Sequence, residues 1–401
     1  MRLMSAVDKS GKFLLEIGYL TAFSLLLIYQ FLQTTMFQIT WPPNYLFYVR
    51  IFLLSFTLIR LGYSEKYTFK EAVLSFCLLL ISLVVFKLNG FEEVMNAALI
   101  IIGSKGIPFR RLVKIYVIIT SVLLFITMVS ALTGVIENLV YTQEGRNTRI
   151  AFGCIYPTDF SAHILYITLS FAYLRRECIT YLELLGIGVL SVLVYLFCQA
   201  RLNCACLCLV MIAFGIYKFR SKYCKKKNIK ILGNKLIVLL SVSPVLCAAV
   251  MILSSMFYSA ENIVTYSLDM LLTHRLYLGK KGIEVYGFSL FGQWVPMQGN
   301  GGTVETQTNY FFLDSSYLFI LLQYGILIFA LILIIILFIN YRAQINRDYI
   351  LIIAVGIMAV QCMVEHHLMD VAYNPFLWAA FAELGIEERQ KKKSRWKRRE
   401  K

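Results

Sequence analysis

The stretch KLIVLLSVSPVLCAAVMILSSMFY, residues 235–258, decides the fold class of this chain. It is apolar almost throughout, and one helix needs roughly 20 apolar residues to cross a bilayer core of about 30 Å. Similar runs recur along the chain, whose residues are 59% hydrophobic and only 15% charged. A soluble core does not require so apolar a composition. The sequence therefore predicts an all-α integral membrane protein.

The apolar runs are continuous and do not alternate between two faces, which excludes a strand barrel. Their number predicts about 12 transmembrane helices. The expected spans lie near 13–33, 44–61, 70–87, 89–104, 112–136, 158–174, 179–198, 202–219, 235–258, 316–339, 349–366 and 371–386.

The distribution of Lys and Arg predicts the orientation of these spans. With the N-terminus inside, 31 of the 39 Lys and Arg residues fall in inward segments, seven fall in outward segments, and Arg50 lies inside a span. Positive charge marks the cytoplasmic side of a membrane protein. Both termini are therefore expected in the cytoplasm, and the first apolar run, which lacks a small-residue cleavage site, is expected to be a retained anchor.

The net charge of +16 raises the question of nucleic acid as a partner. The basic loop near 222–230 and the basic tail 387–401 both adjoin spans, where such clusters attract anionic lipid headgroups. Membrane lipids are thus the expected partners of this charge, and no nucleic acid is expected.

The chain is expected to form a single polytopic membrane domain, 1–401, with two outward insertions at 137–157 and 259–315. The second insertion is far longer than a helix connection requires, and long loops inside a compact fold are usually functional. Within it, four leucines recur at helical spacing, which predicts an amphipathic helix lying on the outer leaflet. These are Leu268, Leu271, Leu272 and Leu276.

Residues suited to chemistry gather in the outward segments. Arg146 and Arg149 lie three apart, and a turn at Pro157 then leads to Asp159 at the start of the next span. Arginine suits phosphate because its planar fork donates parallel hydrogen bonds and keeps its charge. Binding of outer-leaflet headgroups is the alternative for the first two arginines. Arg201 occupies the short turn QARLN between two spans, where a charge tends to face the bundle interior or a wet cavity.

Glu365, His366, His367 and Asp370 form a second outward cluster that offers candidate general bases. A solvated turn is the alternative interpretation. The two histidines are adjacent and point apart, and no pair of histidines has the helical spacing of metal ligands, so a metal-dependent transferase is not expected.

His163, His274 and Arg50 are also predicted in the outer half of the membrane, within reach of outward water. A lone membrane histidine is often a hydrogen-bonding residue between packed helices. Arg50 either snorkels outward or lines the same cavity as the other arginines.

The run RIAFGCIYPTDFSAHILY, residues 149–166, resembles the arginine, glycine and proline signature of Wzy-type polysaccharide polymerases of the O-antigen polymerase and ligase superfamily. Further resemblance lies, in order, in QAR (199–201), HRLYLGKKGIEVYGFSLFGQ (274–293), DSSYLFILLQYGI (314–326) and YNPFLWAAF (373–381). Two departures stand out. Many relatives carry His-Pro-Asn where this chain has Tyr156, Pro157 and Thr158, and His274 falls where a small residue is common.

The resemblance implies transfer of a growing glycan from undecaprenyl diphosphate to the sugar of another lipid-linked repeat unit. Arg149, Arg201 and Arg275 are then the expected diphosphate clamp, with Arg146 as a fourth member. Preorganised arginines can stabilise the leaving diphosphate without a metal, so no metal or cofactor is expected. The acceptor hydroxyl must lose a proton, and three residues are candidates for accepting it. These are Glu365, His366 and Asp159.

The resemblance further implies a multi-pass protein of the bacterial cytoplasmic membrane that acts at its outer face in making capsule, exopolysaccharide or O-antigen. Its substrates would be undecaprenyl-diphosphate-linked oligosaccharide repeat units, with a flippase and a chain-length regulator as optional partners. A ligase that attaches glycan to another acceptor would use the same arginines and stays open as an alternative. A flippase for lipid-linked sugars is a second alternative, although repeated halves and charges throughout the spans are expected of a transporter.

Overall fold

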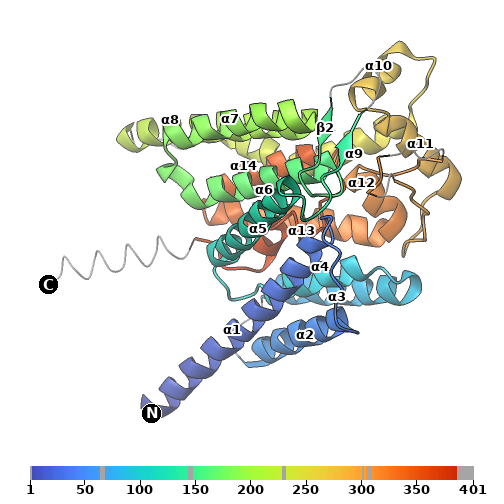
Figure 1. The fold of residues 1–401 in the computed structure, drawn as a ribbon. Helices are drawn as coiled ribbons and strands as arrows, with labels where there is room; N and C mark the ends of the chain where they lie inside the picture. Colours follow the sequence, from blue (N-terminus) through green and yellow to red (C-terminus); the bar gives the residue numbers. More distant parts are fainter. Residues whose placement is uncertain are drawn as a thin grey trace.

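The computed structural model of this chain describes residues 2–63, 68–142, 148–227, 232–299, 302–304 and 309–385, and it is almost entirely helical (Figure 1). Arg146 and the basic tail 387–401 lie outside these residues. The α-helices are α1 (Arg2–Leu32), α2 (Tyr45–Tyr63), α3 (Phe69–Asn89), α4 (Glu92–Gly103), α5 (Phe109–Leu132), α6 (Pro157–Arg175), α7 (Tyr181–Cys198), α8 (Arg201–Lys227), α9 (Asn234–Met256), α10 (Ile263–Leu271), α11 (Arg275–Tyr286), α12 (Ser316–Phe319), α13 (Ile326–Ile345) and α14 (Tyr349–Gln361).

Seven helices of the described residues are long and apolar enough to cross a membrane. They are α1 from Gly11, α3, α5, α7, α8 to Tyr223, α9 and α13. The expected class of an all-α, membrane-embedded protein is confirmed, whereas the expected count of about 12 spans is not. Two of the other expected spans are shorter helices. The span expected at 89–104 is α4, with 12 residues, and the span expected at 349–366 is α14, with 13 residues.

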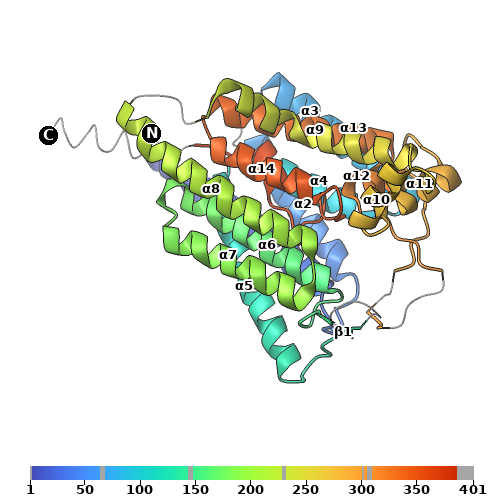
Figure 2. The same cartoon turned by 90° about the horizontal axis from the view of Figure 1, so that it is seen from above.

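Helix α14 lies at the centre of the bundle, between α6 and α8 on one side and α9 and α13 on the other (Figure 2). Eleven of its 13 residues are buried. The outward-pointing side chains of α5, α7 and α9, in contrast, are large and apolar, as lipid contact requires. The sequence pattern of a continuous apolar run thus has two different causes, burial in protein and exposure to lipid.

The expected span at 371–386 is wrong in its secondary structure. This segment crosses the protein interior as turns and the short 3₁₀ helix η3 (Phe376–Ala380), because Pro375 cannot continue an α-helix. Its freed backbone groups find partners inside the protein. Arg342 donates to the carbonyls of Ala379, Ala380 and Ala382, the last at 2.9 Å. Irregular backbone at membrane depth is tolerated where protein surrounds it in this way.

The expected span at 316–339 is broken near its start. The chain forms α12 and the π-helical turn η2 (Ile320–Tyr324) before Gly325, and the long helix α13 begins only after it. Gly325 has a φ of +91°, and a Cβ there would lie 2.3 Å from the backbone nitrogen of Gly292. The loop before α12 therefore packs its backbone directly onto the break.

The single amphipathic helix expected from the four leucines is two helices. Helix α10 ends at Leu271, and α11 begins at Arg275 after Thr273 and His274 adopt left-handed φ values of 54° and 66°. Buried Asp269 stabilises this junction, because its carboxylate accepts hydrogen bonds from the backbone nitrogens of Leu276 and Tyr277 at 2.8 and 3.0 Å.

The two ends of the bundle differ in charge. One end, here the basic end, gathers arginines that tie helix ends together. Arg60 at the end of α2 donates to Gly103, and Arg110 at the start of α5 donates to Leu174, both at 2.8 Å. The opposite end, here the pocket end, holds the ends of α1, α7 and α14, the starts of α6 and α8, and both insertions.

Candidate functional site

The segment from Arg149 to Pro157 reaches the pocket end through three local features. Arg149 lies in strand β2 (Arg149–Ile150), which pairs antiparallel with β1 (Val140–Tyr141). Gly153 has a φ of +82°, and a Cβ there would lie 2.9 Å from the Thr127 carbonyl of α5. Pro157 occupies the first turn of α6, where its missing N–H costs no helical hydrogen bond. Each residue of the arginine, glycine and proline pattern therefore has a separate physical role.

This segment is fixed to its neighbours by backbone hydrogen bonds. The backbone nitrogen of Met36, just after α1, donates to Gly153 at 2.8 Å, and that of Ile155 donates to Thr34 at 3.0 Å. Arg149 itself donates from Nε to the Cys198 carbonyl at the end of α7, at 3.1 Å. Arg149 is therefore held between the hairpin and the α7–α8 turn.

Arg201 is the first residue of α8. The turn before it is two residues long, and Gln199 makes it possible by adopting a left-handed φ of 52°. No side-chain hydrogen bond or ion pair joins Arg201 to another residue in the part of the chain that the structure describes. Its guanidinium group thus keeps its full donor capacity for a ligand.

Arg275 begins α11 and is more strongly engaged. Its Nε donates to the Val364 carbonyl at 3.0 Å, its Nη1 donates to Thr273, and its Nη2 lies 3.4 Å from Asp314 Oδ2. Arg275 thus also connects the α10–α11 junction to the loop after α14.

The loop 362–375 follows α14 at the pocket end and supplies Glu365 and His366. Ser316 at the start of α12 holds this loop, since its backbone nitrogen donates to the Cys362 and Glu365 carbonyls at 3.0 and 3.2 Å. The Glu365 side chain is buried, and the His366 ring lies against Phe312 and Phe319, with ring centroids 5.1 and 5.8 Å apart.

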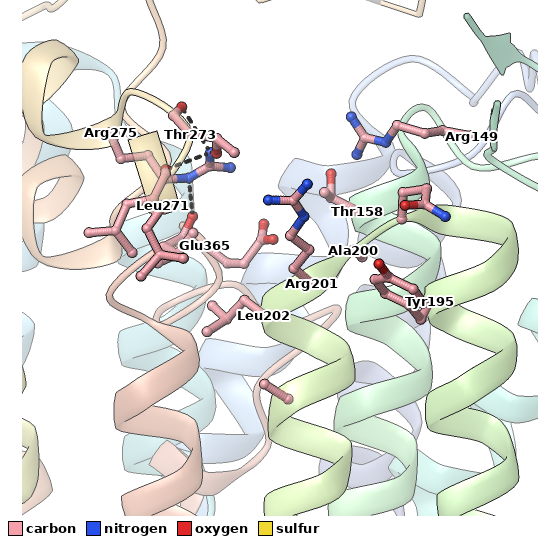
Figure 3. A pocket seen from close by; sticks show the side chains of 14 residues that line it. Arg149, Thr158, Tyr195, Ala200, Arg201, Leu202, Leu271, Thr273, Arg275 and Glu365 are labelled. Carbon is pink, nitrogen blue, oxygen red and sulfur yellow. Dashed lines mark hydrogen bonds between the residues drawn. The ribbon is translucent and has the colours of Figure 1, made fainter. Parts of the chain in front are cut away.

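Arg149, Arg201, Arg275 and Glu365 line one cavity of about 560 Å³, here the arginine cavity. Figure 3 shows the Glu365 carboxylate directed toward Arg201, with Arg275 on one side and Arg149 on the other. Four segments far apart in the sequence supply these residues. The arrangement concentrates positive charge around one buried carboxyl group.

A second cavity of about 310 Å³, here the middle cavity, adjoins the first. It shares Arg149, Arg275 and Glu365 with the arginine cavity and adds Asp159 and His366. The structure therefore brings together all three candidate proton acceptors and all the candidate arginines that it describes. Their chemical roles stay predictions.

Burial changes the acid–base properties of the loop residues, which lie outside the membrane-spanning helices. Burial raises the pKa of Glu365 to about 7, with Arg275 opposing the rise and Asp314 adding to it. Burial lowers the pKa of His366 below its usual value, so its ring is neutral at neutral pH. Glu365 can therefore exchange a proton under physiological conditions, and neutral His366 can accept or donate a hydrogen bond.

Two of the four histidines are not within reach of water. His163 and His367 are buried, and both rings stack on the Tyr373 ring, at centroid distances of 4.0 and 3.7 Å. His163 also hydrogen bonds Thr34 Oγ1 at 2.8 Å. The prediction that all four reach outward water is wrong for these two, because Tyr373 covers both rings and Phe31 of α1 also packs on His163.

Arg50 and His274 stand apart from the arginine cavity. Arg50 pairs with Glu92 and donates to Asn96 Oδ1 at 2.7 Å, which ties α2 to α4. His274 lies 3.1 Å from Asp269 and is largely exposed. Both side chains are explained by local structure.

Asp314, Tyr310 and Tyr156 also line the middle cavity, and sequence reasoning gave none of them a role. Asp314 opens the DSSY segment that carried part of the resemblance, so a signal for it was present. Tyr156 lies in the run 149–166 that also carried the resemblance. Tyr310 carried no signal, because its place in the cavity depends on how the second insertion folds.

Within the described ranges, no group of three or more His, Cys, Asp or Glu side chains could hold a metal ion. Searches for similar proteins found no matching family model, no matching curated protein and no matching solved structure.

Proposed function

We propose that this protein polymerises a bacterial surface polysaccharide, by transferring a growing glycan from undecaprenyl diphosphate to another lipid-linked repeat unit. One observation carries the proposal: three arginines from separate segments converge on a buried carboxyl group in one cavity. Such a site suits a reaction in which a diphosphate leaves and a hydroxyl group loses a proton.

In the proposed reaction, the acceptor hydroxyl oxygen attacks the anomeric carbon of the donor sugar. The bond between that carbon and the diphosphate oxygen breaks, and its electron pair stays on the leaving diphosphate. The arginines stabilise the charge that develops on this group. Glu365 takes the hydroxyl proton, and Asp159 and His366 are the alternative acceptors in the adjoining cavity.

The proposed location is the outer face of the bacterial cytoplasmic membrane. The arginines of the basic end lie at the far end of the bundle from the arginine cavity. Since positive residues accumulate on the cytoplasmic side, the cavity would open to the outside. Lipid-linked sugars that a flippase delivers would then reach it.

The test uses the full chain purified in detergent with authentic lipid-linked repeat units as the sole substrate. We expect longer glycans and released undecaprenyl diphosphate, with or without a chelator. A flippase should give neither product, and a ligase that needs a different acceptor should not lengthen the chain. Failure to lengthen glycans would reject the proposal, whereas lengthening that stops with chelator would reject only the metal-free mechanism.

Substitution of Arg201 by Lys tests the clamp. Lys keeps the charge but cannot donate two parallel hydrogen bonds, so we expect Arg201→Lys to lower the rate by roughly 10²-fold. Arg111→Lys is the matched control, because Arg111 lies at the basic end and pairs with Glu16. A normal rate and polymer length in Arg201→Lys would contradict a role for its fork.

A further inference from the structure

A third cavity of about 650 Å³, here the acidic cavity, lies on the other side of His366. It shares His366 and Phe312 with the middle cavity. The middle cavity therefore adjoins both the arginine cavity and the acidic cavity. Elements α1, α4 and η2 and the loop around Trp294 form its walls. Its chemistry differs from that of the arginine cavity, and the proposed diphosphate clamp does not account for it.

The charge of this lining is negative. Glu92, Glu93 and Asp370 contribute three carboxyl groups, and none of the described residues that line the cavity is Lys or Arg. Arg50, which does not itself line the cavity, pairs with Glu92 and offsets the negative charge of that carboxylate. Glu93 has no ion pair or hydrogen bond with another residue among those described. An anion entering this cavity would therefore meet uncompensated charge of the same sign.

The remaining lining combines aromatic rings with amide groups. Trp294 stacks on Phe91 with an interplanar angle of 11° and a centroid distance of 6.1 Å, and the Tyr324 ring also contacts Phe91, with a centroid distance of 5.2 Å. Trp294 is 69% exposed, which is unusual for so large a ring. The electron-rich face of an exposed indole attracts the polarised C–H bonds of a sugar ring and attracts cations more strongly.

The amide groups supply directional hydrogen bonds. Gln33 and Gln323 both line the cavity, and Gln323 Oε1 has no hydrogen-bond partner in the part of the chain that the structure describes. A side-chain amide both donates and accepts hydrogen bonds, so it can pair with the hydroxyl groups of a ligand. Aromatic faces, amides and carboxylates together provide acceptors for hydroxyl groups and for an amino group.

We propose that the acidic cavity binds a sugar of the glycan and selects neutral or amino-bearing sugars over sugars that carry a carboxylate or phosphate. The inference rests on the proposed glycan transfer, because it assigns the arginine cavity to the diphosphate and the acidic cavity to the sugar. The opposite charges of the two cavities then fix the direction in which a lipid-linked sugar lies across Glu365 and His366.

The test is a binding titration of the purified full chain in detergent, read from tryptophan fluorescence and compared with Trp294→Phe. The probes are soluble oligomers of glucosamine, of N-acetylglucosamine and of galacturonate. We expect the first two to bind and the glucosamine oligomer to bind at least roughly tenfold more tightly than the galacturonate oligomer. The Glu93→Gln/Asp370→Asn double variant should reduce this preference to within about threefold.

Glu261→Gln is the control for net charge, because Glu261 is exposed at the pocket end and does not line the cavity. It should keep the wild-type preference. Equal binding of galacturonate, an unchanged preference in the double variant, or no binding of any probe would overturn the inference. Since binding needs no glycan transfer, sugar binding without polymerisation would reject only the proposed function, and polymerisation without the expected preference would reject only this inference.

Discussion

Glu365 combines two conditions that a general base needs. Its carboxyl group is buried at the boundary of the arginine and middle cavities, and that burial raises its pKa to about 7. An exposed glutamate is ionised far below neutral pH and is a weak base. Raising the pKa toward the working pH strengthens the base while leaving a useful fraction of it ionised.

The rate of glycan transfer should therefore depend on pH near neutrality. A general base must be ionised to act, so kcat should rise with pH through about 7 and level off above it. In Glu365→Gln, kcat should fall by roughly 10²- to 10⁴-fold and lose this rising limb. The measurement is kcat for lipid-linked substrate between acid and alkaline pH.

Asp370→Asn provides the control for this profile. Burial also raises the pKa of Asp370 to about 7, but Asp370 lies in the acidic cavity and does not line the other two. The rising limb should persist in this variant. If the rising limb disappeared in Asp370→Asn and remained in Glu365→Gln, the titrating group would be Asp370, and the role of Glu365 as general base would be contradicted.

At the scale of the secondary-structure elements, the contact between Gly292 and Gly325 joins the second insertion to the start of α13. Gly292 has a φ of +84°, and a Cβ there would lie 2.4 Å from the Gln323 carbonyl. Around it, Gln293 donates to Gln323 at 3.0 Å, and Ile326 donates to Ser289 at 2.9 Å. The late Phe-Gly pair of the sequence therefore fastens the second insertion to the break before α13.

Gly325→Ala should lower the thermal midpoint of the purified protein. A left-handed conformation costs a non-glycine residue about 1–3 kcal/mol, and the new methyl group also meets the backbone of Gly292. Gly134→Ala separates the two effects, because Gly134 has a φ of +77° with nothing within 4 Å of an added Cβ. If both variants lower the thermal midpoint by the same amount, the close contact between residue 325 and the Gly292 backbone contributes nothing measurable.

At the scale of the whole molecule, the bundle separates a basic end from a pocket end. Successive long helices run in alternating directions, and each connection at the basic end carries Lys or Arg. At the pocket end, Arg149, Arg201 and Arg275 gather around one cavity. At the basic end, Arg60 and Arg110 donate to carbonyls at the ends of neighbouring helices.

Reporter fusions should recover this polarity. We expect fusions near Lys227 and at the C-terminus to report the cytoplasm and an insertion near residue 300 to report the exterior. The measurement is paired activity of a reporter that works only outside and one that works only inside. An external signal from the Lys227 fusion would reverse the orientation and remove the cavities from the outer face.

The sequence by itself determined the membrane class, the approximate limits of α3, α5, α7 and α9, and the short turn before Arg201. These features depend on local composition, since lipid contact demands apolar side chains and a saturated backbone wherever the chain crosses. It also supplied arginines and a Glu-His pair that the structure brings into adjoining cavities. Residue type alone made these candidates recognisable.

Only the tertiary structure decided that 371–386 crosses the interior without forming an α-helix. Its apolar composition resembles that of a span, but Pro375 prevents the helix, and Arg342 and neighbouring backbone replace the lost hydrogen bonds. Likewise, only packing decided that His163 and His367 are buried against Tyr373, whereas His366 lines two cavities. The acidic cavity combines residues from α1, α4, η2 and two loops, and no pattern along the chain predicts such a meeting. Burial and long-range contact depend on how the elements pack, and hydropathy does not distinguish a residue covered by protein from one covered by lipid.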